Sequence, residues 1–285
     1  MKIVRLGMTE TSLLFLSYVS KNIVLNVENK KHISKIIMSM INWLYTTSGY
    51  YDKSVPGNCF NFEYNALNSN LIKYINDLGT SIGNCEEAHV FMHEGYVMNL
   101  FEQYKTQFFN HYNIINFKLL NGSQFYDRID TIFNYMKDKK VLIVSSFDGL
   151  IQMQYDSGNV YKVHAKFPLL KKLSTVKFPY CFLNNGPDAN FYETLDKIFM
   201  QISNIDFDIA ILGCGAYGHP LCHKIDNELK KDAIYIGGSI QTLFGILSSR
   251  EKNSGKLQTN EYWITEIPKE YRPSNYNLIE NGCYW

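Results

Sequence analysis

Residues 207–246 of the chain read FDIAILGCGAYGHPLCHKIDNELKKDAIYIGGSIQTLFGI. An apolar run, Phe207 to Leu212, leads into a glycine-rich turn. A helical segment, Pro220 to Lys230, then separates this run from a second one, Ala233 to Ile236. A strand, a tight turn, a helix and a second strand make one βαβ unit, whose two strands lie parallel in a sheet. This stretch therefore predicts an α/β fold.

Gly213, Gly215 and Gly218 in the turn have the G-x-G-x-x-G spacing. Such glycines let a ligand approach the backbone, and the start of the next helix offers free N–H groups to a phosphate. The simpler alternative is a turn that only packs the helix against the strand. A nicotinamide dinucleotide is disfavoured, because the second strand ends in Ile236 and two glycines instead of the expected carboxylate. The turn favours a nucleotide or a sugar phosphate.

Other apolar runs extend this pattern along the chain. Val141 to Val144 is typical of a buried parallel strand, and residues 1–6, 88–92 and 176–183 predict further strands. Helical periodicity predicts helices over residues 30–46, 62–78, 96–105, 125–137, 149–155 and 191–202. We therefore expect one Rossmann-like domain over 1–285, with a mostly parallel sheet flanked by helices. Within it, core βα units cover 122–246, and a helical portion over 20–120 packs on the sheet.

Composition narrows the class of protein. The formal net charge is +1, so no global field attracts nucleic acid or an anionic membrane. No apolar run approaches the ~20 residues that a transmembrane helix needs, and the N-terminus does not read as a signal peptide. The six cysteines lack the spacing of a disulfide framework, which favours a reduced, cytoplasmic protein. The oligomeric state stays open.

Carboxylates and glycines follow several predicted strands. Arg5 lies at the end of the first predicted strand and Glu10 in the turn after it, while Asp148 follows Val144. Open α/β folds bind ligands at this edge of the sheet. Either carboxylate could deprotonate a hydroxyl or hold a divalent cation, and either could instead only stabilise the start of a helix. Two cysteines and two histidines lie close together in the sequence: Cys214, His219, Cys222 and His223. They could suggest a zinc site, but they contain no C-x-x-C pair, so zinc is disfavoured.

The polar residues 247–260 predict a loop, in which Arg250 could reach a phosphate. The chain ends in an unusually aromatic segment, residues 280–285, ENGCYW. A free tail is normally polar. This aromatic segment therefore predicts a terminus that packs against the rest of the protein or covers a ligand-binding site.

Several segments together resemble a known family: RLGMTE (5–10), KKVLIVSSFDGLIQMQY (139–155), DFDIAILGCGAYGHPLCHKI (206–225), AIYIGGSIQTLFGI (233–246), EYW (261–263) and ENGCYW (280–285). The set resembles glycosyltransferase-like proteins of the GT-D fold group. The amino-terminal motif of that group looks like R-x-G-D-G-E, and its acidic pair is associated with a metal ion and the donor diphosphate. Arg5, Gly7 and Glu10 match this motif, whereas Met8 replaces the aspartate and Thr9 the second glycine.

The resemblance implies a glycosyltransferase that moves a sugar from a nucleotide-sugar donor, above all a UDP-sugar, to a glycan or other hydroxyl acceptor. Glu10 would be the base, or the ligand of a Mn²⁺ or Mg²⁺ ion, and Asp148 is the second candidate for the base. The residues expected to bind the donor are Arg5, Gly7, Thr9, Phe147, Gly213, Gly215, Ala216, Tyr217, Gly218, Gly238 and Gln241. Two alternatives stay open: a non-catalytic protein that binds nucleotide or glycan on the same scaffold, and an NAD(P)-dependent oxidoreductase.

Overall fold

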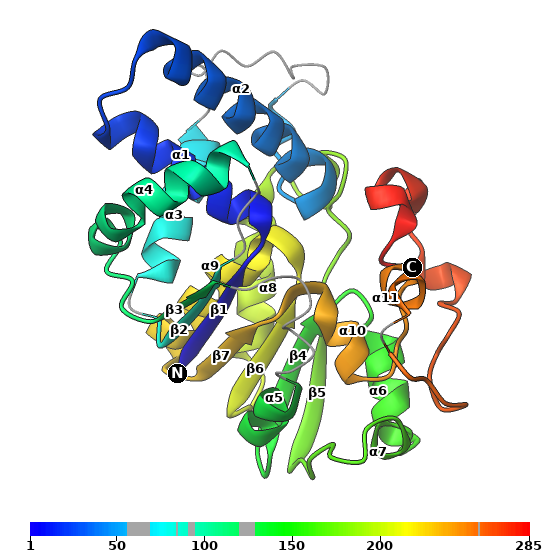
Figure 1. The fold of residues 1–285 in the computed structure, drawn as a ribbon. Helices are drawn as coiled ribbons and strands as arrows, with labels where there is room; N and C mark the ends of the chain where they lie inside the picture. The colour runs from blue at the N-terminus through cyan, green and yellow to red at the C-terminus, as the bar shows by residue number, and fades with distance from the viewer. Residues whose placement is uncertain (56–68, 84, 91–94, 120–128, 256) are drawn as a thin grey trace.

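A computed structural model describes residues 1–55, 69–83, 85–90, 95–119, 129–255 and 257–285. The described strands form one parallel sheet of seven, in the order β3-β2-β1-β7-β6-β4-β5 (Figure 1). Their bounds are β1 (Lys2–Leu6), β2 (Glu87–Val90), β3 (Phe117–Leu119), β4 (Lys140–Ser145), β5 (Lys172–Lys177), β6 (Ile209–Gly213) and β7 (Asp232–Tyr235). The α/β class with a parallel sheet is therefore confirmed.

Helices cover both faces of the sheet (Figure 1). One face carries α1 (Met8–Asn22), α2 (Val27–Trp43), α3 (Ser69–Ile82), α4 (Tyr96–His111), α8 (Phe191–Ser203) and α9 (Gly218–Lys224). The other carries α5 (Ile129–Met136), α6 (Asp148–Asp156), α7 (Val160–Val163) and α10 (Ile240–Leu243). A further short helix, α11 (Ser249–Ser254), lies near the C-terminal residues.

The alternation of side chains along each strand explains why both faces are covered. Successive side chains of a strand point to opposite faces. Leu142 and Val144 of β4 therefore join the core beneath α8 and α9, while Val141 and Ile143 join the core beneath α6 and α10. All four side chains are at most 1% exposed, as expected for a strand that is apolar along its whole length.

The strand order brings distant parts of the chain to one edge. β1 lies between β2 and β7, so the residues after β1 meet those after β7 and β6. β4 lies between β5 and β6 in the sheet, so the strands that follow β4 in the chain are added first on one side of it and then on the other. In open parallel sheets, ligands bind beyond the carboxyl ends of the strands where the order reverses.

Several boundaries differ from the expected ones. The portion 20–120 also supplies β2 and β3, and residues 247–260 contain α11 instead of loop alone. β5 spans Lys172–Lys177, so the strand predicted over 176–183 was wrong except for its first two residues. Pro179 has no backbone N–H to donate to a sheet. α1 begins at Met8, with Gly7 as its N-cap. The predicted helices over 62–78 and 125–137, and the strand over 88–92, lie partly outside the described residues.

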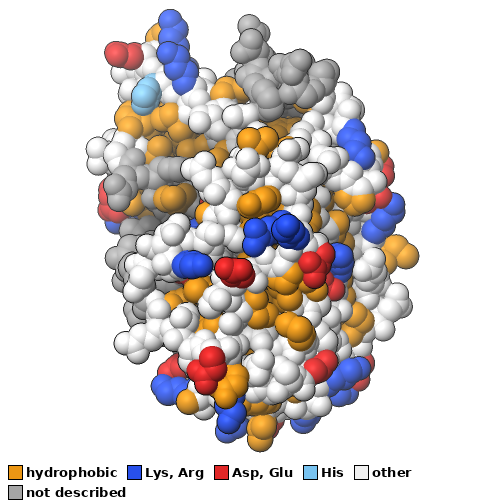
Figure 2. All heavy atoms as spheres, turned by 90° about the vertical axis from the view of Figure 1, so that its right-hand side faces the viewer, with side chains coloured by type: hydrophobic (Ala, Val, Ile, Leu, Met, Phe, Trp, Pro, Cys, Tyr) orange, Lys and Arg blue, Asp and Glu red, His pale blue; other side chains and the backbone are white. Residues whose placement is uncertain are grey.

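Two observations concern the outside of the molecule. None of the helices in the described ranges has the length and apolar character required to cross a bilayer. The face formed by α10, α11 and the C-terminal residues carries lysine and arginine beside aspartate and glutamate (Figure 2), so that charges of both signs mix on it.

Candidate functional site

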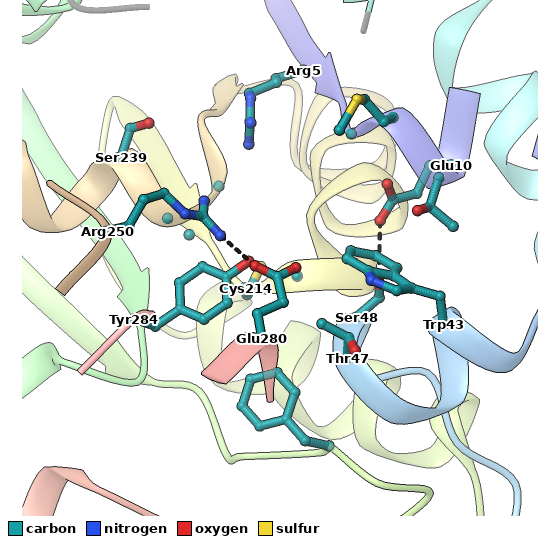
Figure 3. A pocket seen from close by; sticks show the side chains of 18 of the residues that line it. Arg5, Glu10, Trp43, Thr47, Ser48, Cys214, Ser239, Arg250, Glu280 and Tyr284 are labelled. Carbon is teal, nitrogen blue, oxygen red and sulfur yellow. Dashed lines mark hydrogen bonds and ion pairs between the residues drawn. The ribbon is translucent and has the colours of Figure 1, made fainter. Parts of the chain in front are cut away.

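A cavity of about 1080 Å³ lies over the carboxyl ends of β1, β4, β6 and β7. Its floor comes from the residues that follow these strands, including Gly7, Ser146, Cys214 and Gly237. The end of α2 and the start of α4 form one wall, and α11 with the C-terminal residues forms another. Arg5 points into the space between Glu10 on one side and the pair Arg250 and Glu280 on the other (Figure 3).

Glu10 is a buried carboxylate in the wall of this cavity. It lies in the first turn of α1, three residues after the N-cap Gly7, and it is only 4% exposed. Its Oε1 accepts a hydrogen bond from Ser48 Oγ at 3.2 Å, while its Oε2 has no hydrogen-bond partner among the described residues. A substrate hydroxyl could supply the missing partner.

The surroundings of Glu10 raise its pKa above the usual value for glutamate. Burial is the largest cause, because water no longer solvates the charged form. The positive charge of Arg5 and the hydrogen bond from Ser48 oppose this shift without cancelling it. A carboxylate with a raised pKa holds a proton more tightly and is a better general base than an exposed one.

Two glycines make room for the charged groups. A Cβ atom on Gly7 would lie 2.3 Å from Glu10 Oε2, so a side chain there would displace the carboxylate. A Cβ atom on Gly237 would lie 2.5 Å from the guanidinium of Arg5, and Gly237 also has a φ of 61°. Both glycines therefore let Arg5 and Glu10 lie close to the backbone at the cavity floor.

A turn of π-helix places Ser48 beside Glu10. α2 ends at Trp43, and residues Leu44–Ser48 continue as a π-turn that closes at Gly49 in the left-handed conformation. Single π-turns often occur at functional sites. The carbonyl oxygen of Ser48 would lie 2.4 Å from a Cβ on Gly215, so the same turn packs against the glycine-rich loop. Sequence reasoning missed Ser48, because no local pattern marks a π-turn.

The three glycines of the G-x-G-x-x-G turn make different contacts. Gly213 and Gly215 line the cavity, whereas Gly218 faces the ring of Tyr235, 2.2 Å from its would-be Cβ. Gly218 is therefore explained by packing of α9 on β7. Ala216 and Tyr217 are fully buried and do not line the cavity, so they lie behind the loop.

The C-terminal residues form the wall opposite Glu10. The guanidinium of Arg250 pairs with Glu280 at 2.5 Å and lies 4.6 Å from the ring centre of Tyr284. Gln241 donates a hydrogen bond to the carbonyl of Tyr284 at 2.9 Å, and Trp285 is 6% exposed. The aromatic terminus is thus both packed down and part of a cavity.

The structure brings most of the sequence-predicted residues together. Those that line the cavity are Arg5, Gly7, Thr9, Glu10, Phe147, Gly213, Gly215, Gly238 and Gln241. Asp148 is the first residue of α6 and is absent from the lining. Its negative charge contributes, after burial, to the raised pKa of Tyr180, which is about 12. Of the two candidate bases, Glu10 alone faces the cavity.

Few side chains at the cavity could act as ligands of a metal ion. Within the described ranges, no three side chains of histidine, cysteine, aspartate or glutamate are close enough to hold one. Cys222 is buried in the hydrophobic core, and burial lowers the pKa of His219 to about 3. At the cavity, the described residues therefore do not fit a metal site built by the protein alone.

Comparison of the chain with family models, with curated proteins and with solved structures gave no match.

Proposed function

We propose that the protein is a glycosyltransferase that moves a sugar from a nucleotide-sugar donor to a hydroxyl acceptor. One observation carries the proposal: Arg5 and the buried carboxylate of Glu10 face one large cavity at the carboxyl ends of parallel strands. The resemblance of RLGMTE and the glycine-rich segments to GT-D proteins supports the same assignment.

The donor diphosphate is assigned to the space between Arg5 and Arg250. Both guanidinium groups line the cavity and enter it from different walls (Figure 3). Guanidinium groups bind phosphate oxygens through paired, charge-assisted hydrogen bonds. Aromatic side chains at the same end, among them Tyr180 and Tyr284, offer flat faces for a nucleobase. The cavity volume of about 1080 Å³ suits a ligand as large as a nucleotide sugar.

Glu10 is assigned as the general base. It accepts the proton of the acceptor hydroxyl while the acceptor oxygen bonds to the anomeric carbon of the donor sugar. The bond from that carbon to the diphosphate oxygen breaks, and the diphosphate leaves with the electron pair. Arg5 and Arg250 stabilise the charge that develops on the leaving group.

The Mn²⁺ or Mg²⁺ ion that the resemblance implies would find Glu10 but not the second carboxylate of the motif, because Met8 occupies that position. The other carboxylates of the cavity lining, Glu251 and Glu280, belong to the opposite wall. Such an ion would depend on phosphate oxygens of the donor for its remaining ligands. In the proposed transfer step, Arg5 and Arg250 supply the positive charge that stabilises the leaving diphosphate.

A thermal-shift screen of nucleoside diphosphates and nucleotide sugars, with manganese or with a chelator, tests the proposal. We expect UDP or a UDP-sugar to stabilise the protein by about 2.7 kcal/mol at a concentration 100 times its Kd. Arg5→Ala should weaken diphosphate binding by roughly tenfold or more. The exposed Lys166→Ala is the charge-matched control and should bind as the wild type does. If no nucleotide in the panel shifts the melting temperature, the proposal fails.

A second candidate is a non-catalytic protein that binds the same ligands. Met8 favours it, because its side chain is 49% exposed at the cavity where the GT-D motif has an aspartate. This candidate predicts nucleotide binding with neither transfer nor donor hydrolysis in any divalent ion. Measuring release of UDP from bound donor, with and without acceptor sugars, separates the two.

A further inference from the structure

The cavity has a second wall that the donor does not use. On the side of Glu10 it is lined by residues that recur along one face of α2 and the following π-turn: Ile36, Met40, Trp43 and Thr47. Figure 3 shows Trp43 on the same side of the cavity as Glu10 and Ser48, away from Arg250. This wall lies across the cavity from the residues assigned to the nucleotide.

Trp43 lies outside both hydrophobic cores. It is partly exposed. Within the described ranges, its indole makes no hydrogen bond and no ring contact with another residue. A tryptophan has the largest apolar face of any side chain, and leaving it open to a cavity gives up the stabilisation that burial would provide.

The π-turn sets Trp43 next to the reacting position. Hydrogen bonds in a π-helix join residues five apart, so Trp43 and Ser48 lie one above the other. Ser48 in turn holds Glu10 through the 3.2 Å hydrogen bond to Oε1. Trp43, Ser48 and Glu10 therefore line the same side of the cavity (Figure 3), where Glu10 Oε2 has no partner among the described residues.

We propose that Trp43 is the platform of an acceptor subsite that binds a pyranose sugar beside Glu10; this inference rests on the proposed transferase function. The C–H bonds on one side of a pyranose form a flat apolar face, which packs on an aromatic ring. Its hydroxyls then point away from the indole, where Thr47, Ser48 and Glu10 supply polar partners. The hydroxyl that meets Glu10 Oε2 is the one that accepts the transferred sugar.

Saturation-transfer NMR with methyl pyranosides of glucose, galactose, mannose and N-acetylglucosamine, in the presence of UDP, tests this assignment. We expect saturation of the ring C–H protons on one face in the wild type. Trp43→Leu should weaken sugar binding by about tenfold, and Trp43→Phe, which keeps a flat ring, by less. Trp263→Phe is the matched control, because Trp263 packs against His164 and does not line the cavity. Binding of UDP should be the same in all of these proteins.

The outcomes separate the two proposals. If UDP binds but no sugar shows saturation that depends on Trp43, the acceptor subsite is wrong and the donor site stands. If p-nitrophenyl glycosides are saturated only on the nitrophenyl ring, the occupant is an aromatic group and the pyranose assignment is wrong. If sugars bind at Trp43 but no nucleotide binds, the subsite stands as a sugar site and the transferase proposal fails.

Discussion

Among single residues, Glu10 lowers the stability of the folded protein when its buried carboxyl group is charged. Its pKa in the folded protein is raised, chiefly by burial, so the folded chain holds this proton to a higher pH than the unfolded chain does. The stabilisation from this group is therefore complete below the unfolded pKa and is lost as the pH rises through the folded pKa.

Glu10→Gln should consequently melt at a higher temperature than the wild type at about pH 8, and the difference should shrink at about pH 5. The same change should lower kcat by roughly 10²- to 10⁴-fold, because the general base is lost. Melting curves and initial rates at both pH values check this. Asp148→Asn, which alters a carboxylate outside the cavity lining, should have the smaller effect on kcat. The opposite ranking would make Asp148 the base.

Ser48 should tune the same carboxylate. Its hydroxyl hydrogen bond favours the charged form of Glu10, so Ser48→Ala should raise the pKa of Glu10 further. We expect the acidic limb of the kcat/KM profile to move to higher pH. Thr46→Val is the control, because Thr46 bonds to Asn42 in the preceding turn instead of to Glu10. An unmoved limb would mean that Glu10 does not carry the titrating proton.

At the scale of elements, the glycines of the glycine-rich loop have different roles: Gly213 and Gly215 line the cavity, whereas Gly218 allows α9 to pack on β7. Gly218→Ala would place a Cβ atom 2.2 Å from the ring of Tyr235, which should destabilise the fold by about 1–3 kcal/mol. The folded fraction should bind UDP with unchanged affinity. Denaturation in urea and calorimetric titration measure the two quantities separately. Loss of affinity at unchanged stability would instead assign Gly218 to the ligand.

Gly215→Ala offers the contrasting case. Gly215 has a φ of 53°, and its would-be Cβ lies 2.4 Å from the carbonyl oxygen of Ser48. A side chain there strains the loop and also pushes the π-turn away from Glu10, so both stability and activity should fall. The comparison of Gly215 with Gly218 separates a glycine of the site from a glycine of the core.

Elements whose pattern is local were predictable from the sequence. β4, β6 and β7 are continuous apolar runs, and the turn after β6 contains its glycines at a recognised spacing. The π-turn, the side chain of Trp43 in the cavity and the pairing of Arg250 with Glu280 were not predictable. No local sequence pattern marks the π-turn. The other two features depend on contacts between segments far apart in the chain, and neither periodicity nor propensity contains that information.

At the scale of the whole molecule, the cavity joins the two ends of the described chain. Residues 5–10 and 280–285 both contribute to its walls, together with the loops after β6 and β7. A ligand that fills the cavity contacts all of these segments at once. Its binding energy should therefore suppress local opening in every one of them.

Hydrogen exchange with and without UDP measures this coupling. At labelling times that report local opening, we expect slower exchange in residues 5–10, 213–215, 237–241 and 280–285 together. α8 does not line the cavity and should exchange as before. Protection confined to one segment would place the ligand outside the common cavity.

The position of β1 has a kinetic consequence. β1 meets β7 through only two residue pairs, Lys2 with Ala233 and Ile3 with Ile234. Strands β4 to β7 all lie within residues 140–235, whereas pairing of β1 with β7 joins residues 2–3 to residues 233–234. Contacts between residues so far apart in the chain form slowly. Arg5 and Glu10 lie directly on and after β1, so on refolding we expect helical circular dichroism to return before nucleotide binding. In this protein the candidate site is therefore expected to form late in folding.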